Sequence, residues 1–410
     1  MSLSPLGQRN FLLLWTGQAV SAFGDGLLPV ALAFAALQIA HSASALGAVL
    51  AVSYGSRVIA SPIGGVWSDR LPRQLVMLAS DGARGAVQLA LGALLITGHA
   101  QLWELIAGML VFGAASGFFV PASTALVPQT TSVERLQQAN ALMGLSRSTT
   151  AVIGPALSGV LVAALSPGWC FVIDGATFIV SAVSLLMMRV AAVGGAREHG
   201  FWAELVEGFR TVVGRRWYLL NLCAHAMWNL GLAITFVLGP IVARDHLGGA
   251  SAWGLITASV GAGSIVGGLF ALRVMPRRPL LVANLALVPA GLIPLSITVP
   301  ESTAVIMAVT AIGFVGLTFL NEVWFATVPQ LMPAEVLARV TSFDWFLSLI
   351  VMPVGYSVAG PLADHFGIPA TLVVAALVMS LPCALIVLVP GVRRVTRNAE
   401  GRVVMEGAPG

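Results

Sequence analysis

Apolar residues dominate this chain in long runs that short polar stretches interrupt. A membrane-spanning helix needs about 20 mostly apolar residues, and twelve segments reach this length, with frequent glycine and proline inside them. The first segment is too long for a signal peptide, so we expect it to remain as a spanning helix. The pattern predicts an all-α membrane protein with helices at 11–39, 44–66, 74–97, 102–126, 138–165, 169–190, 218–243, 251–273, 279–299, 303–328, 337–361 and 368–390.

The composition indicates lipid rather than water as the main solvent. Of 410 residues, 58% are hydrophobic and 9% are charged, and the mean hydropathy is +0.92. Soluble domains average about 25% charged residues, so a water-soluble protein of this length is excluded. The three cysteines lie in separate apolar segments, so we expect neither a disulfide framework nor a metal site.

The 21 basic residues are all arginines, and their positions predict the orientation of the chain. If the N-terminus is cytoplasmic, nearly all arginines between helices fall on the cytoplasmic side, and only Arg244 falls outside. We therefore expect a multi-pass protein of the inner (plasma) membrane with both termini in the cytoplasm. This orientation also explains the calculated pI near 9.5 without a nucleic-acid partner.

The two halves of the sequence resemble each other. Matching residues recur at an offset of 201 or 203, and each half holds six predicted helices, so equivalent helices cross the membrane in the same direction. This predicts a parallel repeat of two six-helix bundles. The matches are Val127-Pro128-Gln129 with Val328-Pro329-Gln330, Glu134 with Glu335, Gly154 with Gly355, Gly159 with Gly360, and Gly64-Gly65 with Gly267-Gly268.

The predicted domains follow from these helices. We expect an N-terminal bundle at 1–190, a cytoplasmic linker at 191–217, a C-terminal bundle at 218–392 and a cytoplasmic tail at 393–410. In the linker, Phe201, Leu205 and Phe209 recur at helical spacing, which favours an amphipathic helix on the inner leaflet over a plain linker.

The short loop after the second helix carries charges in a recognisable pattern. The stretch Gly65-x-x-x-Asp69-Arg70-x-x-Arg73 resembles the loop signature of the major facilitator superfamily. In that family the acid and the arginines contact neighbouring helix ends and hold one conformation closed, as partial charges at helix termini allow. The alternative is that these charges only orient the chain. The predicted cytoplasmic gate consists of Gly65, Asp69, Arg70, Arg73, Glu134 and Arg339.

A second motif lies in the fifth predicted helix. Gly154-Pro155-x-x-Ser158-Gly159 is similar to the Gly-Pro motif of exporters in the superfamily, where these residues permit close packing and a bend. Together with "SDR" after the second helix and "VPQ" at the end of the fourth, it resembles the branch that contains enterobactin exporters and macrolide-efflux proteins. The resemblance implies the two-bundle fold and export. The fourth helix lacks the central arginine of many proton-driven exporters, so their mechanism does not transfer directly.

Charged residues inside the predicted helices are candidates for function, because an ionised side chain at mid-bilayer costs about 2.5–3.5 kcal/mol or more. Asp25, Arg57 and Arg147 lie near the middle of helices that line the central cavity in the family. We predict that Asp25 binds and releases a proton beside these arginines. The alternative is a permanent Asp25–Arg57 ion pair. If Asp25 neutralises one of the two arginines, the other keeps an uncompensated positive charge, which would suit an acidic substrate.

Other membrane charges have weaker functional indications. Asp81 and Arg84 are three residues apart and are interpreted as a local pair, whereas Asp174 and Glu104 are interpreted as interfacial. In the second half, aromatic residues beside acids predict either a substrate cavity or ordinary packing. The predicted cavity residues are Glu322, Trp324, Asp344, Trp345, Trp228 and Asn229, with His225 as a weaker candidate.

Together these features predict a secondary active transporter that exports a small amphipathic molecule by proton antiport and alternating access. The sequence has neither a phosphate-binding GxxxxGK loop nor a catalytic constellation, so we expect no enzyme activity and no cofactor. The expected partners are a small-molecule substrate, protons and the bilayer, with the protein as a monomer. An importer, a lipid flippase and a non-transporting membrane sensor are the alternatives.

Overall fold

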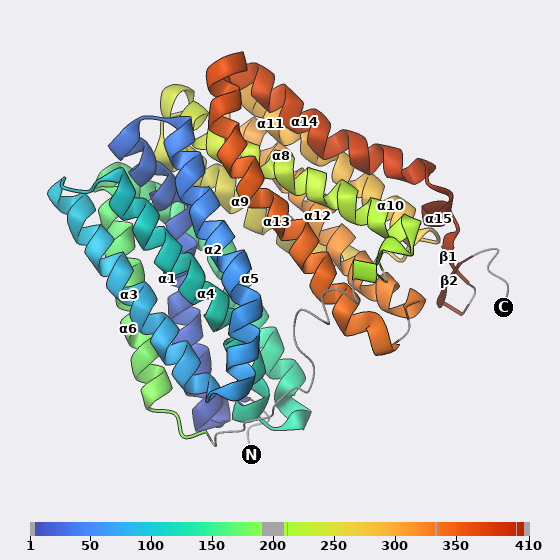
Figure 1. Ribbon diagram of the computed structural model, residues 1–410, viewed down its shortest axis with the longest axis horizontal. Helices are drawn as coiled ribbons and strands as arrows, with labels where there is room; N and C mark the ends of the chain where they lie inside the picture. The colour runs from blue at the N-terminus through green and yellow to red at the C-terminus, as the bar shows by residue number, and fades with distance from the viewer. Residues whose placement is uncertain (1–4, 191–208, 211, 333, 399, 406–410) are drawn as a thin grey trace. The chain divides into compact units, whose positions relative to one another are not determined.

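The computed structural model describes residues 5–190, 209–210, 212–332, 334–398 and 400–405, and most of them are helical (Figure 1). They form two compact units. Unit 1 consists of Met1–Glu198 and Ala243–Ala258, and unit 2 of His199–Val242 and Ser259–Gly410. Residues 243–258, which lie in the seventh and eighth predicted helices, are grouped with unit 1. The amphipathic helix predicted around Phe201 and Leu205 lies outside the described residues.

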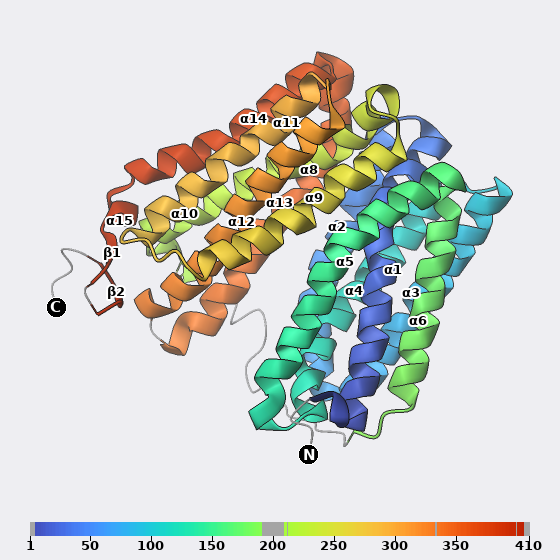
Figure 2. The same cartoon turned by 180° about the vertical axis from the view of Figure 1, so that it is seen from behind.

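Unit 1 contains six long helices that lie side by side (Figures 1 and 2). Helix α1 packs against α5 and α6, α2 against α4, and α3 against α4 and α6. Apolar side chains such as Phe11, Met77 and Leu126 form a buried cluster at the end where α1 begins and α6 ends. The helices are α1 (Arg9–Ala40), α2 (Ala43–Arg70), α3 (Arg73–Thr97), α4 (Leu102–Thr130), α5 (Leu136–Ala164) and α6 (Pro167–Leu186), with short 3-10 turns at Pro5–Gly7 and Val133–Arg135.

Unit 2 is built in a similar way, and α10 and α11 pack against α12 and α14. After the last helix, the tail forms a two-stranded antiparallel hairpin in which Val395 pairs with Met405. The Val403 N–H donates to Gln330 Oε1 at 2.9 Å, which holds the hairpin at the end of α12. The elements are α8 (Arg216–His246), α9 (Ala250–Ala271), α10 (Pro279–Leu287), α11 (Leu292–Thr298), α12 (Thr303–Leu331), α13 (Ala334–Phe366), α14 (Ile368–Leu385), α15 (Pro390–Arg393), β1 (Val395–Arg397) and β2 (Val403–Met405).

Among the described residues, eleven helical segments are long and apolar enough to cross a membrane. The predicted segment 74–97 is not among these eleven and corresponds to α3, which has 25 residues and is long enough to span at about 1.5 Å per residue. It is less apolar because its sequence includes Asp81, Arg84 and Gln88. All three side chains are buried. The chain is therefore a multi-pass membrane protein whose third helix carries polar groups into the bundle.

The predicted helix 279–299 is interrupted in the structure. A 3-10 turn at Val288–Gly291 separates α10 from α11. Pro289 has no backbone N–H and cannot continue the helical hydrogen-bond ladder. The Ser380 hydroxyl of α14 donates to the Val288 carbonyl at 2.9 Å, so this carbonyl is satisfied at the break.

Close contacts at glycines recur in the two halves. A Cβ on Gly154 would lie 2.7–2.8 Å from the backbone of Gly26, so α5 touches α1 there. The matching Gly355 on α13 approaches α8 equally closely, at 2.8 Å from the Leu230 carbonyl oxygen. Gly64 on α2 likewise packs on α4, and Gly267 on α9 packs on α12. The repeated glycines thus mark equivalent helix crossings, as the parallel repeat predicts.

The crossing of α1 and α5 gives a direct test of this packing. Gly154→Ala should destabilise the protein by about 1–3 kcal/mol, because the new methyl group would meet backbone atoms that cannot move aside. Gly144→Ala is the matched control on the same helix, since a Cβ there has no neighbour within 4 Å. Thermal unfolding in detergent should show a lower melting temperature for the first variant only, and equal melting temperatures would contradict the packing.

Candidate functional site

Polar side chains from three helices meet inside unit 1. On α3, residues at spacings of three and four share one helix face, and on α6 the same spacing recurs. Because α3 and α6 pack against each other and α1 packs against α6, these faces lie together. The buried network consists of Asp81, Arg84 and Gln88 on α3 and Asp174, Thr177 and Ser181 on α6, and Asp25 on α1 joins it.

Arg84 is the cation at the centre of this network. Its guanidinium forms an ion pair with Asp81 one turn away, and its Nη1 lies 3.6 Å from Asp25 Oδ2. The rings of Phe119 and Phe178 lie against the guanidinium, with centroids 4.2 and 4.3 Å from Cζ. Two carboxylates and two aromatic faces therefore stabilise one buried positive charge.

The structure corrects the partner predicted for Asp25. Among the described residues Asp25 has Arg84 within 4 Å, and no ion pair joins it to Arg57 or Arg147, whose side chains are exposed. The alternative interpretation, a permanent Asp25–Arg57 ion pair, is therefore not what the described residues show, since the ion pair of Asp25 is with Arg84. Hydropathy gave the depth of each charge but not its direction around the helix, so Asp81 and Arg84 were interpreted as an isolated pair.

The acids of the network differ in their access to solvent. The Asp25 side chain is 40% exposed, whereas that of Asp81 is fully buried. Ser181 donates a hydrogen bond to Asp81 Oδ2 at 2.7 Å, so both oxygens of this carboxyl have partners. Of the two acids paired with Arg84, Asp25 is therefore the one that a proton from the solvent can reach.

Asp174 is not interfacial, as the sequence suggested, but fully buried. It accepts a hydrogen bond from the amide of Gln88 on α3. Gly24 allows α1 to approach, because a Cβ there would collide with Asp174 Oδ1 and Thr177 Oγ1. The other acid interpreted as interfacial, Glu104, accepts from the Gln101 N–H at 2.8 Å and caps the start of α4.

Unit 2 contains a cavity of about 150 Å³ between α8, α12 and α13. Whole ligand sites usually measure about 300–1,000 Å³, so this cavity can hold only part of a drug-sized molecule. Both aromatic rings and polar groups line its wall. Its lining includes His225, Trp228, Asn229, Asn321, Trp324 and Asp344.

Asp344 is the acid of this cavity and is held by three donors. Trp324 Nε1 donates to Asp344 Oδ2 at 2.7 Å, and the Tyr218 hydroxyl donates to the same oxygen at 3.1 Å. Ser348 donates to Oδ1 at 3.4 Å. The rings of Tyr218 and Trp324 stack with centroids 5.3 Å apart, and His225 meets Trp324 edge-on at 5.1 Å. These contacts fix the carboxylate against an aromatic wall.

Trp228 contributes an unused donor to the cavity. Its side chain is 1% exposed, and its Nε1–H makes no hydrogen bond to the part of the chain that the structure describes. An indole N–H can only donate, and leaving it unsatisfied costs about 1–3 kcal/mol. A cargo molecule with an acceptor oxygen would satisfy this group.

Four of the predicted cavity residues line this space together, namely Trp228, Asn229, Trp324 and Asp344. Glu322 is exposed and does not line the cavity. The side chain of Trp345 lies outside the described residues. Tyr218 was missed, because a tyrosine in the first turn of α8 resembles the aromatic residues common at membrane interfaces.

The predicted gate residues lie around the ends of α2, α3 and α4. Arg73 Nη1 donates to the Ala125 carbonyl of α4 at 2.9 Å, which ties the start of α3 to the last turns of α4. Gly65 has no neighbour within 4 Å of an added Cβ, and Arg70 and Glu134 are exposed. The side chains of Asp69 and Arg339 lie outside the described residues.

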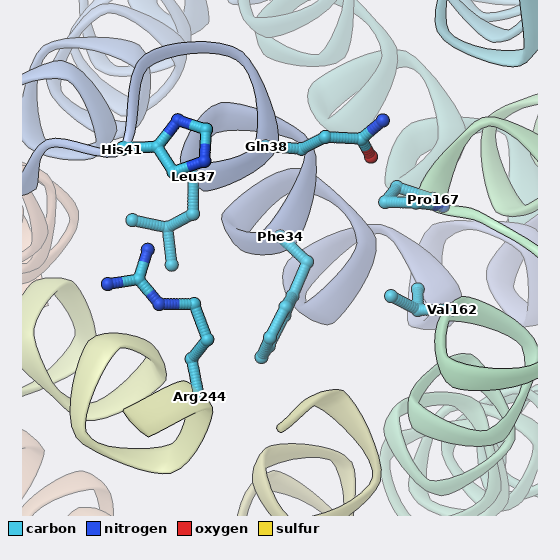
Figure 3. Close-up of a pocket in the computed structure, with 7 residues that line it drawn as sticks. All are labelled: Phe34, Leu37, Gln38, His41, Val162, Pro167 and Arg244. Carbon is cyan, nitrogen blue, oxygen red and sulfur yellow. The ribbon is translucent and has the colours of Figure 1, made fainter. Parts of the chain in front are cut away.

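Unit 1 has a larger pocket that sequence reasoning did not anticipate (Figure 3). It measures about 310 Å³ and lies where α1 ends, beside the start of α6 and the last turn of α8. Apolar side chains form much of the wall, and the Arg244 guanidinium at its edge is paired with Asp245 at 2.7 Å. The lining residues are Phe34, Leu37, Gln38, His41, Val162, Pro167 and Arg244.

Solved transporter structures share this architecture. The nucleoside transporter NupG superimposes with a TM-score of 0.72 and 13% identity, over 92% of this chain and 98% of that chain. A POT family transporter in complex with 5-aminolevulinic acid gives a TM-score of 0.74 and 14% identity, over 93% of this chain and 96% of that one. At these identities the likeness shows the fold alone.

Curated relatives extend the comparison to sequence. Macrolide efflux protein A of Streptococcus pyogenes is 22% identical over 366 residues, covering 88% of this chain and 90% of the relative. Enterobactin exporter EntS of Salmonella typhimurium is 28% identical over 270 residues, covering 63% of this chain and 62% of the relative. These relatives are transporters, not enzymes. The sequence profile of the Major Facilitator Superfamily matches residues 14–355, and the chain belongs to this family of membrane transporters.

Proposed function

We propose that this protein exports a small amphipathic molecule from the cytoplasm by proton antiport and alternating access. It acts as a monomer in the plasma membrane, with both termini in the cytoplasm and residues 1–190 and 218–392 as the two bundles. The observation that carries the proposal is the half-exposed Asp25 paired with the buried Arg84 inside unit 1. Two relatives named for macrolide efflux and enterobactin export support the outward direction.

Asp25 serves as the proton site in this proposal. As a carboxylate it attracts Arg84 together with Asp81, and as a carboxylic acid it releases its share of that attraction. A proton taken up from the outer side and released to the cytoplasm would thus change the charge at the α1–α3 contact once per cycle. Arg57 and Arg147, exposed on α2 and α5, are proposed to tune this exchange through their positive charge.

The cavity of unit 2 is proposed to hold the aromatic or apolar part of the cargo. The stacked Tyr218 and Trp324 rings offer an apolar wall, and the free N–H of Trp228 offers a donor. We assign Asn229, Asp344, Glu322 and Trp345 to the same cargo path. This combination suits an amphipathic molecule with a ring system and an acceptor oxygen.

Gating at the cytoplasmic side is assigned to the loop between α2 and α3. The Arg73 contact with the Ala125 carbonyl is the type of helix-end interaction that could keep this side closed. Gly65, Asp69, Arg70, Glu134 and Arg339 are proposed to complete the gate. The Gly154-Pro155 motif and Gly159 are proposed to let α5 pack closely against its neighbours, as their tight contacts suggest.

Asp25→Asn should abolish uphill export while leaving the protein folded, because asparagine keeps the size of aspartate but cannot exchange a proton. Uptake of erythromycin, and separately of a catecholate siderophore, into everted vesicles under an imposed pH gradient measures this. Asp245→Asn is the matched control, since Asp245 is 42% exposed and also paired with an arginine. Full pH-driven transport by the Asp25 variant would remove this residue from the mechanism.

Trp228→Phe tests the cavity of unit 2. The ring is kept and the N–H is lost, so the KM for the transported probe should rise roughly 2- to 12-fold with little change in kcat, as expected for loss of one hydrogen bond. Trp67→Phe, an exposed tryptophan on α2, should leave KM unchanged. An unchanged KM in the Trp228 variant would show that the cargo does not use this donor.

A further inference from the structure

We propose that Asp174 is a second proton-binding residue of unit 1, which stays protonated while Asp25 gains and loses its own proton. This residue lies on α6, is fully buried, and has no part in the export cycle described above. The proposal rests on its contacts, on the count of charges around it, and on two neighbouring oxygens that lack donors.

The charges of the network do not balance. Arg84 supplies one positive charge, and its guanidinium is already engaged by Asp81 and Asp25. Among the residues that the structure describes, the side-chain hydrogen-bond partner of the Asp174 carboxyl is the neutral amide of Gln88. An ionised carboxylate in this position would be a second excess negative charge inside the bundle, where even one costs about 2.5–3.5 kcal/mol or more. Protonation removes that charge.

The hydrogen bonds around Asp174 leave room for a proton. Asp174 Oδ1 and Gln88 Oε1 are both buried, and neither receives a hydrogen bond from the described residues. A proton on Asp174 supplies a donor for one of these acceptors, Gln88 Oε1, since a protonated carboxyl donates as well as accepts. A 180° rotation of the Gln88 amide exchanges the positions of Nε2 and Oε1. The Oε1 atom then accepts a hydrogen bond from the protonated carboxyl of Asp174.

The ionisable groups that face Asp174 are few. Helix α1 contributes Asp25, and α3 contributes Asp81 and Arg84. Helix α6 itself contributes the buried thiol of Cys170, one turn before Asp174, and the arginine in the middle of α5, Arg147, is exposed. Gly24, the chain neighbour of Asp25, brings the α1 backbone close to Asp174, since a Cβ there would collide with Asp174 Oδ1. Two neighbouring carboxyls titrate as a pair, and the second negative charge is disfavoured. The buried member therefore keeps its proton, and the half-exposed Asp25 exchanges.

Infrared spectroscopy of the purified full-length protein in detergent tests this assignment without any cargo. In neutral buffer the wild type should show the C=O stretch of a protonated carboxylic acid, shifted in D₂O, and Asp174→Asn should lose it. Asp245→Asn, which removes an exposed carboxylate, should keep the band. A band that survives in Asp174→Asn, or a wild type without any band, would overturn the proposal.

Two further measurements test the assignment if other bands overlap the carboxylic-acid band. Gln88→Leu should shift the band by removing its hydrogen-bond partner, and an unmoved band would contradict the assignment. Asp174→Asn should also melt at nearly the wild-type temperature, because asparagine resembles a protonated aspartate, whereas Asp81→Asn should melt lower because it weakens the pair with Arg84. Equal losses in both variants would show that Asp174 is ionised and stabilising.

Discussion

One buried guanidinium organises the interior of unit 1. Arg84 sits on α3, pairs with Asp81 on its own helix and Asp25 on α1, and is flanked by Phe119 of α4 and Phe178 of α6. In a bilayer such a charge persists only where partners surround it. The contacts of this single side chain therefore constrain the rotation of four helices about their axes, and the apolar side chains pack in the orientations that remain.

Close helix packing complements this polar centre. Glycines at equivalent positions in the two halves bring helix backbones into contact, as between α1 and α5 and between α8 and α13. Lipid offers little hydrophobic driving force between helices, so such small-residue contacts and interhelical hydrogen bonds carry much of the association. Rigid bundles of this kind hold an acid and an arginine at fixed depth. A proton can then alter their attraction without disrupting the fold.

Much of the fold could be predicted from the sequence because lipid demands long apolar runs. The spans, the two-bundle repeat and the family followed from hydropathy, matching glycines and the charged loop. The break at Pro289 was missed because prolines also lie inside unbroken membrane helices, as Pro29 does in α1. The Asp25–Arg84 pair and the burial of Asp174 were missed because hydropathy gives depth along a helix but not direction around it. In unit 2, aromatic residues beside acids did indicate the cavity, since Trp324 and Asp344 share it.

The central claim is that Arg84 interacts directly with Asp25 across α1 and α3. A double-mutant cycle of Asp25→Asn and Arg84→Gln, measured by unfolding of the purified protein in detergent, isolates that interaction. Residues in one ion-pair network typically show a coupling energy of about 0.5–3 kcal/mol. The account predicts a favourable coupling in this range. A coupling of zero within error would show that the two residues are independent, and it would contradict the account.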